Sequence, residues 1–373
     1  MKFLSLIHFF IFFILIIHMN YYTYNDLIST LDNLTKFSVL ELNENSKVVV
    51  SEYGGRPLGI FPHPDFCSMI WINPNLKETI SNHRRDIGGD RYWISPERLF
   101  FYRNPELWEG WFCPEKLDPA HFKIRNASKH SCELKTPIEV ENQLTKEIYE
   151  GAISRDIKLI DDPLSSDLHF CGIEYCDVCT LDKPNLKVNG WSLTNIISGG
   201  SGNSGTVLIP TKHEAKPLSY FRPIPHERLI IERNYVGFKI DVSDIYKLAI
   251  RPEDIDFSKE AKIGYLLKIP KSEYYGLLIK LSDDIPKSQD ECFDVARDHP
   301  KSEIGVIQSY NSESLKKSEL RYGEIELQLN IFKSKNGYSV GEATHQLLAY
   351  IGSKKEIFHI VEKLLEIRNP KLF

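Results

Sequence analysis

The sequence lacks a basic stripe. Its 373 residues contain 46 Lys and Arg against 51 Asp and Glu, a formal net charge of -5, and no lysine or arginine cluster is interleaved with aromatic residues. Because a surface that follows a phosphate backbone needs clustered positive charge, we expect no nucleic-acid partner. Low-complexity tracts and repeats of a fixed period are also absent, which argues against a repeat protein.

The N-terminus lacks a clear cleavage site. After Lys2, residues 3–17 read FLSLIHFFIFFILII, an apolar run typical of a signal peptide and short for a membrane span of ~20 residues. No small-x-small triplet follows. Residues 1–19 are therefore predicted to be a signal peptide or an uncleaved membrane anchor of an exported protein, with membrane contact through this segment only. The alternative is translation from Met19 and a cytoplasmic protein.

Paired cysteine motifs from separate segments are missing. The seven cysteines are an odd number, and three of them, Cys171, Cys176 and Cys179, lie close together with His169 just before them. Four such ligands could hold zinc in a tetrahedral site. The alternative is a loop with one disulfide and a spare thiol, or with reduced cysteines only. We expect no metal and no cofactor.

Long helical patterns are few. Residues 24–34 and 353–367 have apolar residues at helical spacing, with Asn25 and Ser353 as expected N-caps. Between them the pattern is predominantly β, and Pro, Gly, Asn and Asp clusters separate most of the runs. This order predicts a large antiparallel sandwich or barrel rather than βαβ units. Residues 197–205, which contain four glycines, are expected to form a flexible hairpin loop.

The clearest alternation in the chain is GEIELQLNIF, residues 323–332. Four aliphatic side chains alternate with Glu324, Glu326, Gln328 and Asn330. On a strand this pattern makes one apolar face and one row of carboxylates and amides. The row is either an ordinary solvated face or the lining of a cleft that binds hydroxyl groups, and the pattern alone does not decide.

A second polar stretch, NHRRDIGGDRYWISPE at residues 82–97, bends at Gly88–Gly89. Four of the five tryptophans, among them Trp93, lie between residues 71 and 111. Indole faces pack against pyranose rings, and charged groups around them bind sugar hydroxyls, although such rings also fill sandwich cores. Asp90 and Arg91 could bind a sugar, or form a salt bridge that braces the bend.

Six segments follow one another along the chain: HRRDIGGDRYWISPE, WFCPEKLDP, GWSLTNI, IGVIQSYN, GEIELQ and the C-terminal THQLLAYIGSKKEIFHIVEKLL. In the order of these segments the chain resembles uncharacterised proteins of the galactose-mutarotase-like superfamily. The resemblance covers roughly residues 24–370. It implies a mainly β fold, a large antiparallel β-supersandwich with a short N-terminal and a C-terminal helix, as one domain over residues 20–373. It also implies a sugar or glycan as the ligand and no cofactor. We expect the protein to be a monomer.

The resemblance also implies roles for individual residues. In the family's aldose 1-epimerases and hexose-phosphate epimerases, a late-strand glutamate takes the proton of the anomeric hydroxyl, and Glu326 is similarly placed. A histidine after a Leu-Thr-Asn stretch supplies the acid, but Ile196 stands at that position here. The candidate acids are therefore His83 and Asp90, with Glu97, His299 and His345 as weaker ones. The expected substrate-binding residues are Arg91, Trp93, Glu97, Gln328 and Glu324.

These residues leave three functions open. The first is an aldose-1-epimerase-like isomerase, and the second is a carbohydrate-binding protein that keeps the cleft without the chemistry. The third is a surface or envelope interaction domain that uses the fold only as a scaffold.

Overall fold

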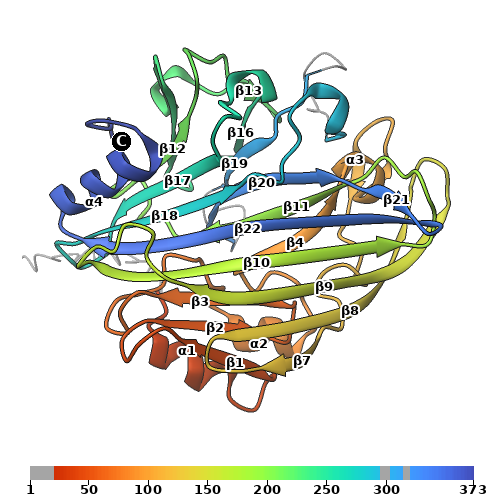
Figure 1. Cartoon of the computed structure of the whole chain (residues 1–373), viewed down its shortest axis with the longest axis horizontal. Helices are drawn as coiled ribbons and strands as arrows, with labels where there is room; N and C mark the ends of the chain where they lie inside the picture. The colour runs from red at the N-terminus through yellow and green to blue at the C-terminus, as the bar shows by residue number, and fades with distance from the viewer. Residues whose placement is uncertain (1–20, 295–302, 314–319) are drawn as a thin grey trace, which may run out of the picture.

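The computed structural model describes residues 21–294, 303–313 and 320–373. The N-terminal segment 1–19 and His299, both singled out above, lie outside these residues. Two large antiparallel sheets make up most of the molecule (Figure 1). Among the described residues, no helix is long and apolar enough to cross a membrane.

The larger sheet runs across the front of Figure 1 and has eleven strands. In spatial order they are β14 (Leu229–Glu232), β15 (Tyr235–Ile240), β12 (Gly205–Pro210), β17 (Ala261–Lys268), β18 (Tyr275–Ser282), β22 (Tyr338–Gly352), β10 (His169–Leu181), β9 (Ile148–Ile160), β8 (Ser131–Glu141) and β7 (Lys123–Ala127), with β21 (Lys333–Lys335) beside β22.

The smaller sheet has six strands and lies behind the larger one. In spatial order they are β13 (Leu218–Ser219), β16 (Tyr246–Ile250), β19 (Ile307–Asn311), β20 (Gly323–Ile331), β11 (Asn189–Ile196) and β4 (Asp90–Ser95). Two minor sheets pair β1 (Phe37–Glu41), β2 (Lys47–Ser51) and β3 (Arg56–Phe61), and β5 (Tyr102–Asn104) with β6 (Glu109–Trp111).

The main core lies between the two large sheets. Ile325 and Leu327 of β20, Ile173 of β10 and Leu347 of β22 are fully buried in one cluster. In β20 these aliphatic residues alternate with the polar row, so its apolar face packs into the sandwich, as the period-2 pattern predicts. The predicted mainly β fold, built of large antiparallel sheets, is confirmed.

Four short α-helices accompany the sheets: α1 (Tyr24–Leu31), α2 (Leu76–Ser81), α3 (Glu97–Phe100) and α4 (Lys354–Ile360). The 3-10 turns η1 (His226–Arg228), η2 (Pro252–Asp254) and η3 (Gln289–Glu291) and the π-turn η4 (Val361–Leu365) complete the described helical segments. The expected cap Ser353 is confirmed, because its hydroxyl accepts from the Glu356 N–H in a capping box. Asn25 is not the cap of α1, where Thr23 forms a capping box with Asp26.

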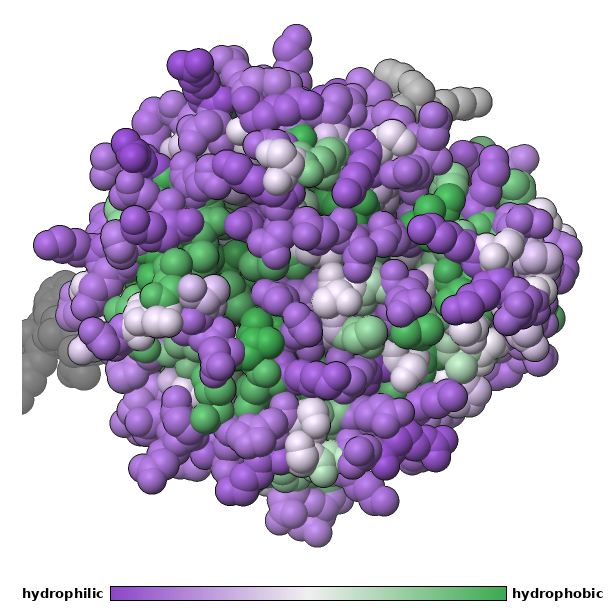
Figure 2. Space-filling model, viewed as in Figure 1, coloured by the Kyte–Doolittle hydropathy of each residue, from purple (hydrophilic) through white to green (hydrophobic). Residues whose placement is uncertain are grey.

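Helix α4 and the following π-turn cover part of the outer face of the larger sheet. Ile357, Ile360 and Leu365 are buried against Leu277 and Leu348 of β18 and β22. In Figure 2, hydrophobic residues remain visible between hydrophilic ones on this outer face. The amphipathic face of the C-terminal helix therefore closes a second, smaller core.

The glycine-rich residues 197–205 differ from the prediction. They connect β11 of the smaller sheet to β12 of the larger sheet, so they cross between layers and are not a hairpin loop. The bend at Gly88–Gly89 is confirmed, with φ of 90° and 88°. A Cβ at Gly88 would lie 2.0 Å from the Trp71 carbonyl oxygen, so only glycine fits this approach.

Candidate functional site

The outer face of the smaller sheet carries a polar cluster. Antiparallel register places Leu193 of β11 between Arg91 of β4 and Glu326 of β20, and Gln308 of β19 beyond Glu326. One step along, Glu324 is paired with Asn195 and Tyr310. Strand alternation therefore brings five of the predicted site residues onto one face: Arg91, Trp93, Glu324, Glu326 and Gln328.

Arg91 and Glu324 form a buried ion pair within this cluster. The guanidinium donates to Glu324 Oε1 and, at 2.7 Å, to Asn195 Oδ1, while the Asn195 amide donates to the same Glu324 oxygen at 2.9 Å. The guanidinium also lies over the Trp93 ring, 4.3 Å from its centroid. Arg91 thus pairs across the sheet. The alternative considered for Asp90 and Arg91, a salt bridge between them that braces the bend, is not formed, because Arg91 pairs with Glu324 and Asp90 with Arg155 and Lys280.

Glu326 has one oxygen bound and one free of partners among the described residues. Its Oε2 accepts from the Trp191 indole N–H and from the Lys247 ammonium, each at 3.1 Å. Its Oε1 is buried without a hydrogen bond. Burial raises the pKa of Glu326 to about 7, although Lys247 opposes the shift. A buried carboxylate with an unbound oxygen can accept a hydroxyl proton near neutral pH.

Lys247, on β16, is a site residue that the sequence did not reveal. Burial alone would lower its pKa, but Glu326 and neighbouring carboxylates raise the pKa above the usual value, so the ammonium stays charged. It lies 4.6 Å from the Trp191 ring centroid. A single lysine on an alternating strand has the same sequence signature as a solvent-facing one, so no local signal distinguished it.

Gln328 extends the cluster towards the end of β4. Its carbonyl oxygen accepts from the Ser95 hydroxyl at 2.7 Å, and its amide donates to Asp294 at 3.3 Å. The Gln308 amide donates to the same carboxylate at 3.1 Å, and Gln308 Oε1 is buried without a partner among the described residues. A second acceptor atom of this face is therefore unsatisfied.

Glu97 and Trp111 lie at the more exposed edge of the cluster. The Trp111 indole N–H donates to Glu97 Oε1 at 2.9 Å, and the Trp111 side chain, 41% exposed, is stacked under the Arg85 guanidinium. Burial raises the pKa of Glu97, with Lys247 opposing. Glu97, a predicted substrate-binding residue, therefore lies within the electrostatic reach of the same lysine as Glu326.

Asp90 lies on the opposite face of β4. Its carboxylate binds Lys280, Arg155 and the Thr194 hydroxyl in the interior between the sheets, and it is fully buried. Burial would raise the pKa of Asp90, but Lys280 and Arg155 hold it near 2. Asp90 is thus already paired on its own side of the sheet. The expectation that it shares a ligand with Arg91 is wrong, because successive strand residues face opposite sides.

None of the described histidines named as candidate acids lies in the cluster. His83 is exposed in the turn after α2, with φ of 54°. His345 lies in the interior between the sheets, where its Nε2 is 2.9 Å from Asp177, and burial lowers its pKa. Ile196 also faces the interior between the sheets, where its side chain and that of Ile240 lie beside Gly323. A side chain at 196 therefore points away from Glu326, and its identity says nothing about the acid.

The three clustered cysteines lie on strand β10 and not in a loop. Cys171 and Cys179 point to one face and Cys176 to the other, because odd and even strand positions alternate. All seven cysteines are free thiols, which agrees with the reduced alternative. Within the described ranges, no group of three or more His, Cys, Asp or Glu residues could hold a metal ion.

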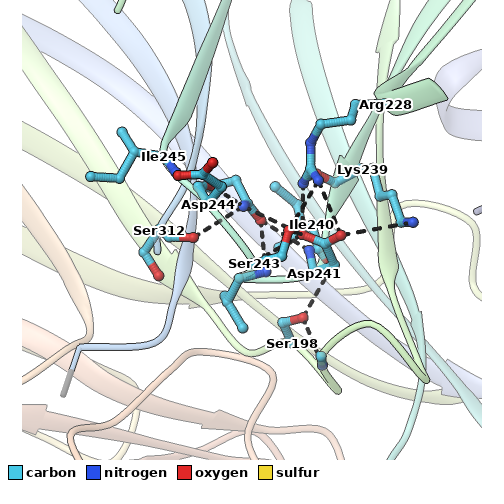
Figure 3. A network of polar contacts seen from close by, with 12 residues as sticks. Ser198, Arg228, Lys239, Ile240, Asp241, Ser243, Asp244, Ile245 and Ser312 are labelled. Carbon is cyan, nitrogen blue, oxygen red and sulfur yellow. Dashed lines mark hydrogen bonds and ion pairs between the residues drawn. The ribbon is translucent and has the colours of Figure 1, made fainter. Parts of the chain in front are cut away.

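A separate polar network fixes the connection that leads into β16 (Figure 3). The Arg228 guanidinium donates to both oxygens of Asp241, at 2.6 and 3.1 Å. Asn311 Oδ1 accepts from the backbone N–H groups of Asp241 and Val242, which holds Val242 at a φ of 49°. A positive φ strains the backbone of a β-branched residue, and the hydrogen bonds to Asn311 hold Val242 in this conformation. The network therefore fixes the start of β16, and with it the position of Lys247.

Comparisons with known proteins bear on the fold. A family of unknown function (DUF6786) matches residues 22–170, and curated proteins give no match. A galactose mutarotase-like protein from Lactobacillus casei has 13% identity and a TM-score of 0.43, with 85% of this chain and 99% of that chain covered. A putative aldose 1-epimerase from Escherichia coli K12 has 9% identity and a TM-score of 0.45, covering 86% and 99%.

A galactose 1-epimerase from Lactobacillus acidophilus shares 11% identity at a TM-score of 0.41, with 84% of this chain and 93% of that chain covered. These similarities agree with the resemblance found in the sequence.

Proposed function

We propose that this chain is a carbohydrate-binding protein whose ligand lies on the outer face of the smaller sheet. The observation that supports this most is the buried, unbonded Oε1 of Glu326, within a cluster of carboxylates, amides and indole rings. An unsatisfied buried carboxylate oxygen is costly, and a ligand hydroxyl would satisfy it. The partly exposed indole of Trp111 at the edge of the cluster offers the apolar surface that the C–H face of a sugar ring needs, whereas Trp93 and Trp191 are buried beneath the polar groups.

A catalytic form of this function is an aldose-1-epimerase-like isomerase. Such a reaction needs a base for the anomeric hydroxyl proton and an acid for the ring oxygen. The raised pKa of Glu326, about 7, suits a base working near neutral pH. Glu97, whose pKa is also raised, takes the role of acid in place of a histidine.

The test is proton NMR of freshly dissolved α-glucose and α-galactose with and without protein. Faster anomerisation supports the isomerase, and line broadening or saturation transfer without acceleration supports a binding protein. Glu326→Gln removes the proton acceptor with nearly the same shape, so any acceleration should disappear, whereas Glu174→Gln, at a partly exposed position on β10, is the matched control. The absence of both acceleration and saturation transfer, over a panel of neutral sugars, would contradict the proposal.

A further inference from the structure

A row of four aromatic rings borders the Glu326 cluster. Phe221 follows edge strand β13, Tyr310 lies on β19, Tyr322 directly precedes β20, and Trp71 donates its backbone N–H to Asn195 of β11. Successive ring centroids are 6.1, 6.1 and 4.8 Å apart. The row therefore crosses the sheet from β13 to β11, almost its whole width.

The row is partly accessible and adjoins the charged cluster. Phe221, Tyr310 and Tyr322 are partly exposed, whereas Trp71 is buried and closes the row. Tyr310 is the direct antiparallel neighbour of Glu324, the partner of Arg91. The row of rings therefore adjoins the buried polar cluster on the same face of the sheet.

The tyrosines of the row offer hydrogen-bond donors as well as ring faces. Neither phenol hydroxyl, of Tyr310 or of Tyr322, has a hydrogen bond to another described residue. Burial raises the pKa of both, so each hydroxyl keeps its proton. A ring that packs against C–H groups and also donates a hydrogen bond matches the two faces of a sugar unit.

We propose that the sugar bound at Glu326 is one unit of a carbohydrate chain, and that its neighbouring units pack along Phe221, Tyr310 and Tyr322. This inference rests on the proposed function. The argument for a longer ligand is the length of the row: from β13 to β20 the three partly exposed rings cross three strand spacings of ~4.8 Å each, more than a single pyranose ring covers. A ligand of several linked units would use the whole row, and a free monosaccharide would not.

The experiment compares each tetrasaccharide with its own monosaccharide, by saturation-transfer NMR and calorimetry on the full chain. The pairs are cellotetraose and maltotetraose with glucose, and chitotetraose with N-acetylglucosamine. At least one tetrasaccharide is expected to bind about tenfold or more tightly than its monosaccharide. Phe221→Ala should remove most of this gain and leave monosaccharide binding unchanged. Tyr338→Ala, which removes a half-exposed ring on β22, should change neither.

Monosaccharide binding with no gain for any tetrasaccharide would overturn the inference and leave the proposed function standing. A gain in tetrasaccharide affinity that Phe221→Ala does not reduce would also overturn the inference, because the additional sugar units would then bind elsewhere on the protein. No binding of any monosaccharide or tetrasaccharide would contradict the proposed function itself. Thermal unfolding of Phe221→Ala serves as the folding control, since this ring packs against the small cluster of Leu218, Tyr220 and Ala249 and the edge of Tyr310, and not into the main core.

Discussion

At the scale of single residues, the titration of Glu326 links the site to stability. Its pKa in the folded chain, about 7, is raised above the ordinary glutamate value of 4.5, because burial disfavours the charged form. The native state therefore binds this proton more tightly than the unfolded state does. The stabilisation is fully present below pH ~4.5 and is lost as the pH rises through ~7.

We therefore expect Glu326→Gln to flatten the dependence of the unfolding free energy on pH. The wild type should lose about 1–3 kcal/mol of stability between pH 4.5 and 8 that the variant does not lose. Urea unfolding at several pH values measures the two slopes. Identical slopes would show that Glu326 titrates normally in the folded chain.

The interior charges around Asp90 give a second prediction. Asp90 and Asp177 balance Arg155 and Lys280, all fully buried, while the lowered pKa of His345 keeps that ring neutral. Asp90→Asn leaves two buried cations with one carboxylate. Breaking such a network should lower the unfolding free energy by about 3–5 kcal/mol.

Denaturant unfolding of Asp90→Asn checks this, with Asp65→Asn as control, because Asp65 is an exposed aspartate. A loss below ~1 kcal/mol for Asp90→Asn would mean that the network contributes little.

At the scale of elements, the N-cap of α4 is a discrete contribution. The Ser353 hydroxyl accepts from the Glu356 N–H, so Ser353→Ala leaves an N–H without its partner. The expected loss is about 1 kcal/mol of unfolding free energy. Lys355→Ala, at an exposed position of the same helix, should change it by less than ~0.5 kcal/mol. Equal effects of the two substitutions would exclude a capping role.

Strand alternation explains what the sequence could predict of these elements. Residues 323–332 alternate strictly, and β20 follows that pattern with its aliphatic face in the core. The alternation did not reveal that the polar face is buried too, because burial of Glu326 depends on Lys247 and Trp191 from distant strands. The local sequence pattern shows which residues share a face of the strand, and contacts with other strands decide whether that face is buried.

The error at Asp90 and Arg91 has a different origin. The sequence contained the signal, since neighbours on a strand must face opposite sides. The two glycines predict a bend within this polar stretch, and its second half is the regular strand β4. A sandwich interior is usually apolar, and this one holds a network of charged side chains that includes Asp90.

At the scale of the whole molecule, the thiols are the simplest test. All seven cysteines are unpaired, and burial raises the pKa of Cys67 and Cys132 to about 12. Thiol titration of the denatured chain should therefore find seven groups, while the native chain should react slowly. Reductant should not change the melting temperature. A count below seven without prior reduction would contradict the free-thiol arrangement.

The balanced charges inside the sandwich also restrict which amino-acid replacements this protein can accept during evolution. Two acids and two bases from both sheets sum to zero in a space that water does not reach. Loss of any one leaves a net charge there, which is far more costly than loss of an oppositely charged pair. Among relatives, Asp90 and Lys280 should therefore be replaced together or not at all. Relatives with a paired replacement at these two positions are expected to keep the same packing of one sheet on the other.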